Sequence, residues 1–115
     1  MTDPPPEFGV SIVQADGHIT ARVTGEVDLA TASDLRQRLE AVIDAGTGNL
    51  EIDLSGVTFL DSSGLLVLLA ARQGLHDTNR RLTVLNPSRA VHRVFELSGL
   101  IEVLDVRTDD GAAAD

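Results

Sequence analysis

Apolar positions along the chain alternate between a spacing of two and a spacing near 3.6, which predicts strands and amphipathic helices in turn. Strands are expected over residues 8–13, 19–23, 50–54, 81–85 and 101–106, and helices over residues 31–45, 63–75 and 87–98. The resulting order, β-β-α-β-α-β-α-β, predicts an α/β fold: a single-domain sandwich with helices packed against a mixed β-sheet. No internal repeat or linker interrupts the pattern.

Turn and capping residues predict where the first elements begin and end. The pair Asp16-Gly17 is typical of a hairpin turn between the first two strands. Thr31, followed three residues later by Asp34, resembles a capping box that opens the first helix. Gly46 is expected to end that helix.

The later elements have their own boundary signals. The third strand is expected to stop before a loop through Phe59, and this loop leads into the second helix. Asn86 is expected to cap the third helix, with Pro87 at its first position, where the missing N–H of proline costs nothing. Gly99 ends that helix.

The composition removes several chemistries. The chain of 115 residues fits one domain, and it has nine basic residues, all arginine, against eighteen acidic ones, so its net charge is −9. Without lysine there is no Walker A phosphate loop or Schiff-base nucleophile, and without cysteine no disulfide or zinc-thiolate site. Three phenylalanines are the only aromatic residues, so neither base stacking nor phosphate neutralisation supports nucleic-acid binding.

The two ends of the sequence differ from its centre. Residues 1–7, which include three consecutive prolines, predict an extended leader, residues 8–106 the folded domain, and residues 107–115 a flexible acidic tail. The first residues lack the basic and apolar regions of a signal peptide, and no apolar stretch reaches the roughly 18 residues of a membrane span. A cytoplasmic protein without membrane association is therefore expected.

A polar tetrad, Asp61-Ser62-Ser63-Gly64, interrupts two apolar runs where a loop after the third strand enters the second helix. One interpretation is a helix N-cap, because Asp and Ser accept hydrogen bonds from first-turn N–H groups and Gly64 relieves crowding. Another is a phosphorylation site, because the free donors and positive dipole end of a helix N-terminus suit a phosphate. The two interpretations are compatible.

Enzymatic chemistry finds no support in the sequence. The tetrad lacks the first Gly of Gly-x-Ser-x-Gly, and no nucleophile and base arrangement can be deduced for His18, His76 or His92. Each histidine is instead expected at the solvated surface. No His-x-x-x-His or related spacing predicts a metal site. We therefore expect no catalytic residue, no metal and no cofactor.

Three separated stretches carry a resemblance to a known family. They are TGEVD at residues 24–28, IDLSGVTFLDSSGL at residues 52–65 and AVHRVFELSGL at residues 90–100. Together they resemble the STAS domain, and more closely the stand-alone anti-sigma factor antagonists of bacteria. The resemblance covers residues 10–106 with the elements in the same order, and it implies a STAS-like sandwich.

The resemblance implies a partner switch. In this family the unphosphorylated antagonist binds an anti-sigma factor that is also a serine kinase, and this binding releases a sigma factor to join RNA polymerase. Phosphorylation by the kinase reverses the binding, and a PP2C-type phosphatase restores it. The family's acceptor directly follows the motif Asp61 and is therefore Ser62. Ser63 holds the second hydroxyl of the motif, and Asp28 matches an acidic position near the acceptor.

The start of the second helix supplies further candidate contacts. Leu66 stands where many relatives have a second Gly, a departure that bears on partner fit rather than on the acceptor. The helix is apolar around its circumference over residues 65–71, although one apolar stripe suffices against a sheet, so flanking helices or a partner must bury the rest. Gly64, Leu66 and Leu69 are expected near the phosphorylation site, the two leucines as exposed contacts.

Two alternatives stay open. The chain could be a STAS adaptor subunit of a phospholipid transporter assembly without obligatory phosphorylation, although the intact acceptor Ser62 and the acidic, free-standing chain argue against that role. The second alternative concerns Asp28 alone. This carboxylate either caps the first helix around Thr31 or contacts the kinase partner, at the sheet edge where the loop of Ser62 also lies.

Overall fold

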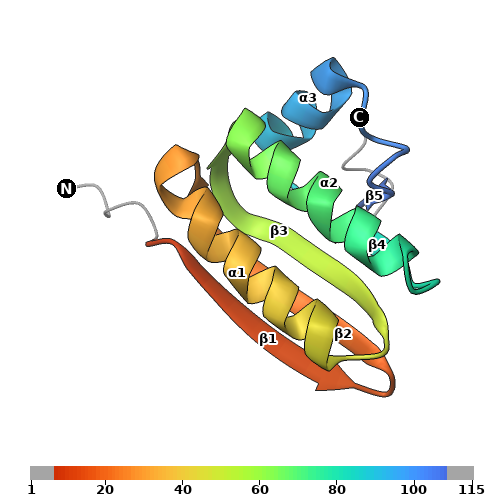
Figure 1. The fold of residues 1–115 in the computed structure, drawn as a ribbon. Coiled ribbons are helices and arrows are strands. Elements are labelled where there is room, and N and C mark those ends of the chain that lie inside the picture. Colours follow the sequence, from red (N-terminus) through yellow and green to blue (C-terminus); the bar gives the residue numbers. More distant parts are fainter. Residues whose placement is uncertain (1–6, 109–115) are drawn as a thin grey trace.

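A five-stranded sheet forms the centre of residues 7–108, the part of the chain that the computed structural model describes (Figure 1). The strands lie side by side in chain order, with β1 antiparallel to β2 and all later neighbours parallel. This arrangement confirms the predicted element order and the mixed sheet. The strands are β1 (Gly9–Ala15), β2 (His18–Val27), β3 (Asn49–Leu60), β4 (Leu82–Leu85) and β5 (Val106–Arg107), and the helices are α1 (Leu29–Ala45), α2 (Ser62–His76) and α3 (Arg89–Ser98).

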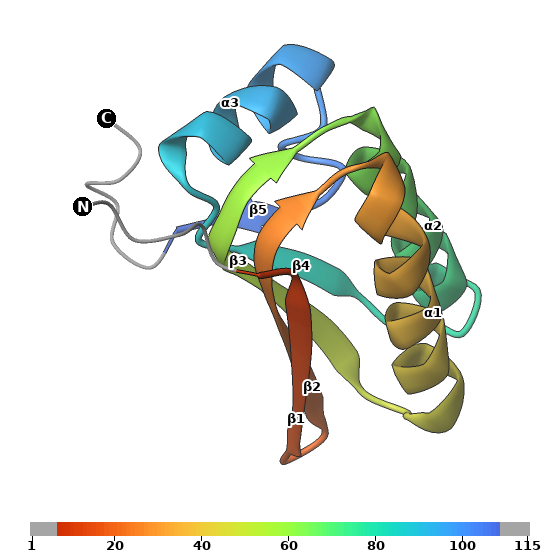
Figure 2. The same ribbon diagram turned by 90° about the vertical axis from the view of Figure 1, so that its left-hand side faces the viewer.

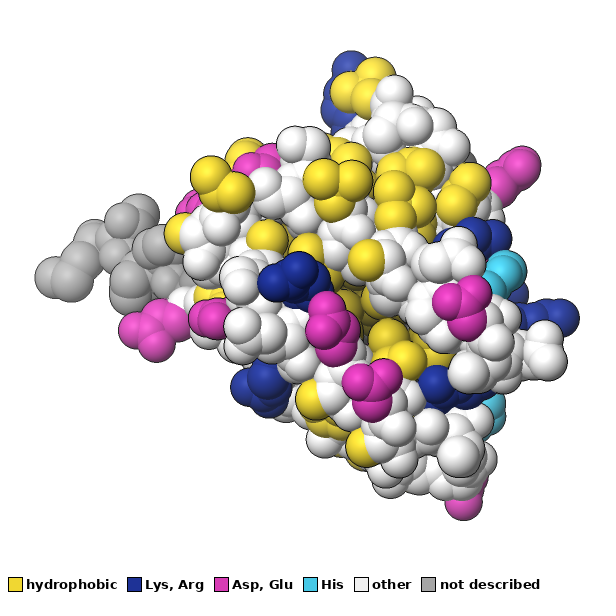
Figure 3. All heavy atoms as spheres, in the orientation of Figure 1, with side chains coloured by type: hydrophobic (Ala, Val, Ile, Leu, Met, Phe, Trp, Pro, Cys, Tyr) yellow, Lys and Arg dark blue, Asp and Glu magenta, His cyan; other side chains and the backbone are white. Residues whose placement is uncertain are grey.

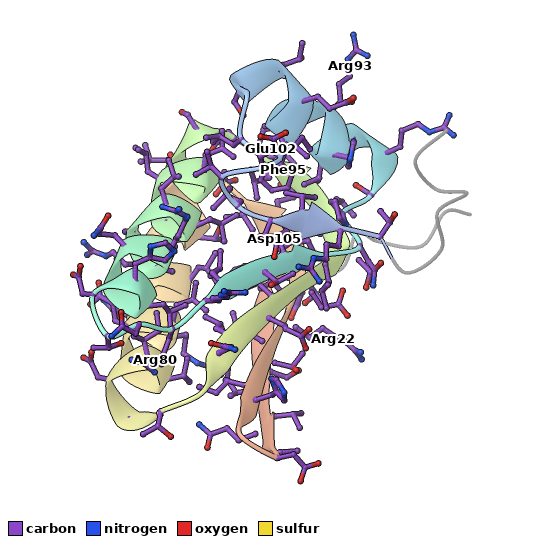
Figure 4. The ribbon with its side chains drawn as sticks, turned by 90° about the vertical axis from the view of Figure 1, so that its right-hand side faces the viewer. Arg22, Arg80, Arg93, Phe95, Glu102 and Asp105 are labelled. Atoms are coloured by element: carbon purple, nitrogen blue, oxygen red, sulfur yellow. The ribbon has the colours of Figure 1, made fainter. Side chains whose placement is uncertain are left out.

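The helices cover the sheet unevenly. α1 and α2 run side by side over one face, and α3 lies across the end of β3 (Figures 1 and 2). Each helix connects two parallel strands, which cannot be joined by a tight turn. On β2 the buried positions alternate with more exposed ones, as in Ile19, Ala21 and Val23. Phe95 of α3 is the largest fully buried side chain and points toward the sheet (Figure 4).

The other face of the sheet is polar. Arg22 of β2 projects from this face (Figure 4), and its Nε lies 3.4 Å from Asp53 Oδ2 on β3. Asp53 is only 9% exposed, and its second oxygen accepts a hydrogen bond from the backbone N–H of Ser55. Because the charge of Asp53 is both paired and hydrogen-bonded, its burial costs little.

The predicted loop through Phe59 is wrong. β3 continues to Leu60 and pairs with β2 along its whole length. Two shifts of register, between Arg22 and Thr24 and between Gly25 and the next residue, interrupt the pairing. Such irregularities break the period-two burial pattern on which the sequence prediction of a strand depends.

Two predicted helix caps are also wrong. α1 begins after Asp28, and Thr31 is the third residue of the helix instead of its cap. α3 begins after Ser88, whose hydroxyl accepts the N–H of Val91 at 3.3 Å. Asn86, the predicted cap, has a φ of 54°, a left-handed conformation that places it in the preceding turn.

The predicted strand over residues 101–106 is also wrong, except at its last residue. Most of this segment forms hydrogen-bonded turns, in which the N–H of Leu104 donates to Leu100 O at 3.0 Å and that of Val106 to Ile101 O at 2.9 Å. Only Val106 and Arg107 form β5, so Arg107 belongs to the sheet and not to the predicted tail. The rest of that tail after residue 108, and the leader before residue 7, lie outside the described residues. Among the described helices, none has the length and apolar character needed to cross a membrane.

Candidate functional site

The sheet topology brings Asp28 and Asp61 to one edge. Val27, the last residue of β2, pairs with Leu60, the last residue of β3, so the two aspartates follow neighbouring strand ends. The backbone N–H of Asp61 donates to Val27 O at 3.2 Å, which ties the start of α2 to the end of β2. The loop of the predicted acceptor Ser62 therefore lies beside the loop of Asp28, as the parallel strands require.

Asp28 is the N-cap of α1. Its Oδ1 accepts the N–H groups of Ala30 at 3.0 Å and of Thr31 at 3.2 Å. The Thr31 hydroxyl in turn accepts the N–H of Asp28 at 3.0 Å, which completes a capping box. Of the two roles that the sequence left open, the capping role is present in the structure. Contact with a partner stays a prediction, and part of Asp28 remains accessible for it, because the residue is only partly buried.

Asp61 caps α2 in a similar way. Its Oδ1 accepts the N–H of Ser63 at 2.9 Å and that of Gly64 at 3.4 Å. Ser62 is the first residue of the helix and is exposed, whereas Ser63 is half-buried. Within residues 7–108, no hydrogen bond holds the Ser62 hydroxyl, so this hydroxyl is free to meet another molecule.

Gly64 allows the first turn of α2 to lie directly on the strands. A Cβ at this position would lie 2.9 Å from Leu60 Cγ and 2.9 Å from Val27 Cγ1, closer than side chains pack. The absence of a side chain thus fixes the height at which α2 begins above the sheet. Gly64 is buried, so its part in the site is to position Ser62 and Ser63 rather than to touch a partner.

Large apolar side chains lie exposed near the ends of β2 and β3 and on the first turns of α1 and α2. Leu66 of α2 is 66% exposed, which agrees with its prediction as an exposed contact. Leu29, the residue after Asp28, is 82% exposed, and Phe59 near the end of β3 is 47% exposed. The sequence analysis missed both. Leu29 stands at the start of α1, outside its buried set of Ala32, Leu35, Leu39 and Ile43, and Phe59 was assigned to a loop.

Leu69 is not exposed, contrary to its prediction, and its contact with a partner stays untested. Leu69 is half-buried and packs against the hydrophobic core. Consecutive residues of a helix are about 100° apart, so three steps from Leu66 to Leu69 fall about 60° short of a full turn. Leu69 therefore points in a different direction from Leu66. The part of α2 that is open to solvent near its start is therefore narrower than the apolar run suggests.

The charge at this edge is negative. Glu26 is exposed on the last part of β2 and pairs in register with Phe59, and the capping carboxylates of Asp28 and Asp61 follow on the two strand ends. The carboxylate of Asp61 already occupies first-turn donors of α2, where a phosphate would otherwise bind. A further negative charge on Ser62 would meet carboxylates here.

Hydrolytic or metal chemistry has no support at this edge. His18 is at the hairpin and His76 at the far end of α2, both exposed. His92 Nδ1 lies 3.4 Å from Glu96 Oε1 on α3. In residues 7–108, no group of three histidine or acidic side chains could hold a metal ion. The edge thus offers an exposed hydroxyl, two capping carboxylates and exposed apolar side chains.

Comparisons with known proteins agree on one family. The family model described as the Mlab, STAS domain matches residues 10–105. The anti-sigma-B factor antagonist of Listeria monocytogenes is 32% identical over 94 residues, which are 82% of each chain. That of Staphylococcus aureus is 29% identical over 99 residues, which are 86% of this chain and 92% of the relative.

Solved structures give the same answer. The crystal structure of an anti-sigma factor antagonist from Mycobacterium paratuberculosis has a TM-score of 0.82 and 30% identity, over 98% of this chain and 95% of that chain. The anti-sigma factor antagonist SpoIIAA in its unphosphorylated form has a TM-score of 0.78 over 92% of both chains, and at 24% identity this likeness speaks for the fold. The chain therefore belongs to the STAS domain family, within the group of the anti-sigma factor antagonists.

Proposed function

We propose that this protein is a phosphorylation-controlled partner switch. Unphosphorylated, it binds an anti-sigma factor that is also a serine kinase and so releases a sigma factor in the cytoplasm. Phosphorylation of Ser62 by that kinase ends the binding, and a PP2C-type phosphatase restores it. The observation that carries this proposal is the free, exposed hydroxyl of Ser62, which directly follows the capping Asp61 at the start of α2, near the exposed Leu29 and Leu66.

The apolar side chains account for binding in the unphosphorylated state. Leu29, Phe59 and Leu66 are large side chains that water surrounds in the free protein. Covering such groups removes apolar surface from water, and a neutral hydroxyl at their centre opposes this only weakly. Leu29 and Leu66 line one hollow with Ser63, so a partner that packs over them would also lie against the neighbouring Ser62, and its kinase site could reach the hydroxyl.

A phosphate at Ser62 would change the same surface by its charge. It adds about −1.5 to −2 charges near neutral pH. Asp61 and Asp28 would repel this charge, and its hydration shell would have to be removed before a partner could cover it. A loss of about 3 kcal/mol in binding free energy weakens affinity more than about a hundredfold, which suffices for a switch without refolding.

Ser62 is a better acceptor than Ser63. Ser62 is exposed, whereas Ser63 is half-buried and lines the hollow between α1 and α2. A kinase must bring the hydroxyl oxygen in line with the phosphate of ATP, which requires an accessible side chain. The position directly after Asp61 is also the one that the family uses.

The test is to incubate the purified protein with each candidate anti-sigma factor from the same genome. One of them should form a complex and, once ATP is added, label the wild-type protein and the Ser63→Ala variant but not Ser62→Ala. Recovery of a transporter ATPase from cell extract, with no binding to any anti-sigma factor, would overturn the proposal in favour of the adaptor role.

A further inference from the structure

A continuous groove separates α1 from α2 on the face shown in Figure 3. Two hollows of about 430 Å³ and about 110 Å³ lie along it and share Arg36, Val67 and Ala70, so they form one depression. The larger hollow opens beside Ser63, and the smaller one reaches Gly74 near the other end of α2. We call this depression the α1–α2 groove. Apolar side chains are visible along it, with acidic side chains beside them (Figure 3).

The shape of the groove suits a helix. From Ser63 to Gly74 it follows α2 for about three turns, or about 17 Å. Its floor contains Val67 and Ala71, and its rim on α2 is formed by the small residues Ala70 and Gly74, which allow close approach. Within residues 7–108, the side chains that line the groove all belong to α1 and α2, so an extended segment would find no strand edge to pair with there, whereas an amphipathic helix could bury its apolar face.

The charges along the rim are on α1. Arg36 Nε lies 3.7 Å from Glu40 Oε1, one turn further along the helix. Asp44 follows after another turn and has no ion pair within residues 7–108. The lower end of the groove is therefore acidic, and a basic side chain on the occupant would complement it. A second copy of this chain, with a net charge of −9, fits less well because it would meet like charge.

We propose that the α1–α2 groove receives one amphipathic helix of the anti-sigma factor, with apolar side chains over Val67 and Ala70 and a basic side chain against Glu40 and Asp44. This inference rests on the proposed function, since the groove begins beside Ser63, next to the acceptor Ser62. It divides the interface into two parts. The edge around Ser62 responds to phosphorylation, and the groove supplies affinity and partner choice at a distance from it.

The experiment measures the affinity of the anti-sigma factor for matched pairs of variants by titration calorimetry. Ala70→Arg places a long side chain in the groove, and Ala41→Arg makes the same change on the exposed side of α1 that does not line the groove. Ala70→Arg should weaken binding about tenfold or more, while Ala41→Arg should change it less than about twofold. Asp44→Arg should weaken binding more than Asp34→Arg, which reverses an exposed charge outside the groove.

The outcomes separate this inference from the function on which it rests. Equal affinities for Ala70→Arg and Ala41→Arg, with wild-type binding still lost on phosphorylation, would overturn the groove alone. If Ala70→Arg instead altered self-association and left anti-sigma factor binding intact, the groove would be an interface between copies. If the wild-type protein bound no anti-sigma factor, both proposals would fall. Thermal melting of each variant confirms that the substitutions leave the fold intact.

Discussion

The two ends of the sheet are closed in different ways. At the end far from Ser62, the Arg80 guanidinium donates to Ile43 O and to Gly46 O, both at 2.9 Å, and so covers the last carbonyls of α1 (Figure 4). Gly48 lies directly against the backbone of Gly17, since a Cβ at Gly48 would lie 1.9 Å from Gly17 O. At this end, the Arg80 side chain and the close contact of two glycine backbones hold the structure together.

At the end with Ser62 the backbone is equally well satisfied, because Asp28 and Asp61 cap the two helices. What differs is the surface. Leu29, Phe59 and Leu66 are exposed there, although burying them would stabilise the fold, whereas Val13 is the exposed large apolar side chain described near the hairpin end. We infer that one end of the sheet serves stability and the other contact with a partner, and substitutions at the two ends should separate these roles.

The largest effect on stability should come from Gly48→Ala. The added methyl group would overlap the backbone of Gly17, so the hairpin and the start of β3 must move apart, at about 2–3 kcal/mol of unfolding free energy. Gly74→Ala is the matched control, because its nearest neighbour, Ile43 Cγ2, would be 4.0 Å away. Urea unfolding measures both. A Gly48→Ala variant as stable as wild type would remove the distinction between the two ends.

Ser62→Asp should give the next largest effect, on binding and not on stability. One negative charge beside Asp61 is weaker than a phosphate, so affinity for the anti-sigma factor should fall about tenfold, less than after phosphorylation. Ser62→Asn is the control, because Asn is neutral and has the same size as Asp, and this variant should bind nearly as tightly as wild type. Calorimetry that finds Ser62→Asp and Ser62→Asn equally tight would contradict an electrostatic switch.

Asp28→Asn tests whether one residue serves both stability and contact. Asn caps helices about as well as Asp, so the free energy of unfolding should change by less than about 1 kcal/mol. If the Asp28 carboxylate also pairs with a basic group of the partner, as the second interpretation holds, phosphorylation of Ser62 should nevertheless slow severalfold. Unchanged phosphorylation kinetics together with lower stability would leave Asp28 with the capping role alone.

The smallest effect concerns Asp105, away from both ends. The Arg107 guanidinium, with help from the Thr83 hydroxyl, lowers the pKa of Asp105 against the opposing effect of partial burial. A carboxyl whose folded pKa is lowered stabilises the protein above the ordinary Asp range, and this contribution is lost as the pH falls through the folded pKa. Asp105→Asn, which tolerates the φ of 49°, should therefore destabilise slightly at neutral pH, with a difference from wild type that disappears in acid. Melting curves of both proteins across this pH range provide the measurement.

The sequence predicted the elements better than their boundaries. The order of strands and helices follows from apolar spacing, which depends on burial and is visible in the sequence. The prediction of the last strand was wrong because Ile101, Val103 and Val106 are β-branched, as is typical of a strand. In the structure, however, the fully buried residue of this segment is Leu104. Turns that are held by backbone hydrogen bonds do not produce a characteristic spacing of apolar residues in the sequence.

The polar residues of the candidate site and the exposed Leu66 were predicted from the sequence, whereas the exposed Leu29 and Phe59 were missed. Asp61 and Ser62 interrupt an apolar run, so they are conspicuous in the sequence. Leu29 and Phe59 are not, because an exposed and a buried leucine or phenylalanine are the same residue until the fold decides which side faces water. The α1–α2 groove was also unpredictable, since it depends on the distance between two helices.

We propose that phosphorylation of Ser62 alone is enough to prevent the protein from binding the anti-sigma factor. The most direct test is calorimetric titration of that factor with the unphosphorylated protein and with the same protein after complete phosphorylation, the site being mapped by peptide mass spectrometry. We expect a single phosphate on Ser62 and an affinity weakened more than about a hundredfold, with unchanged circular dichroism. A phosphate on Ser63 of the wild-type protein, or equal affinity of the two forms, would contradict it.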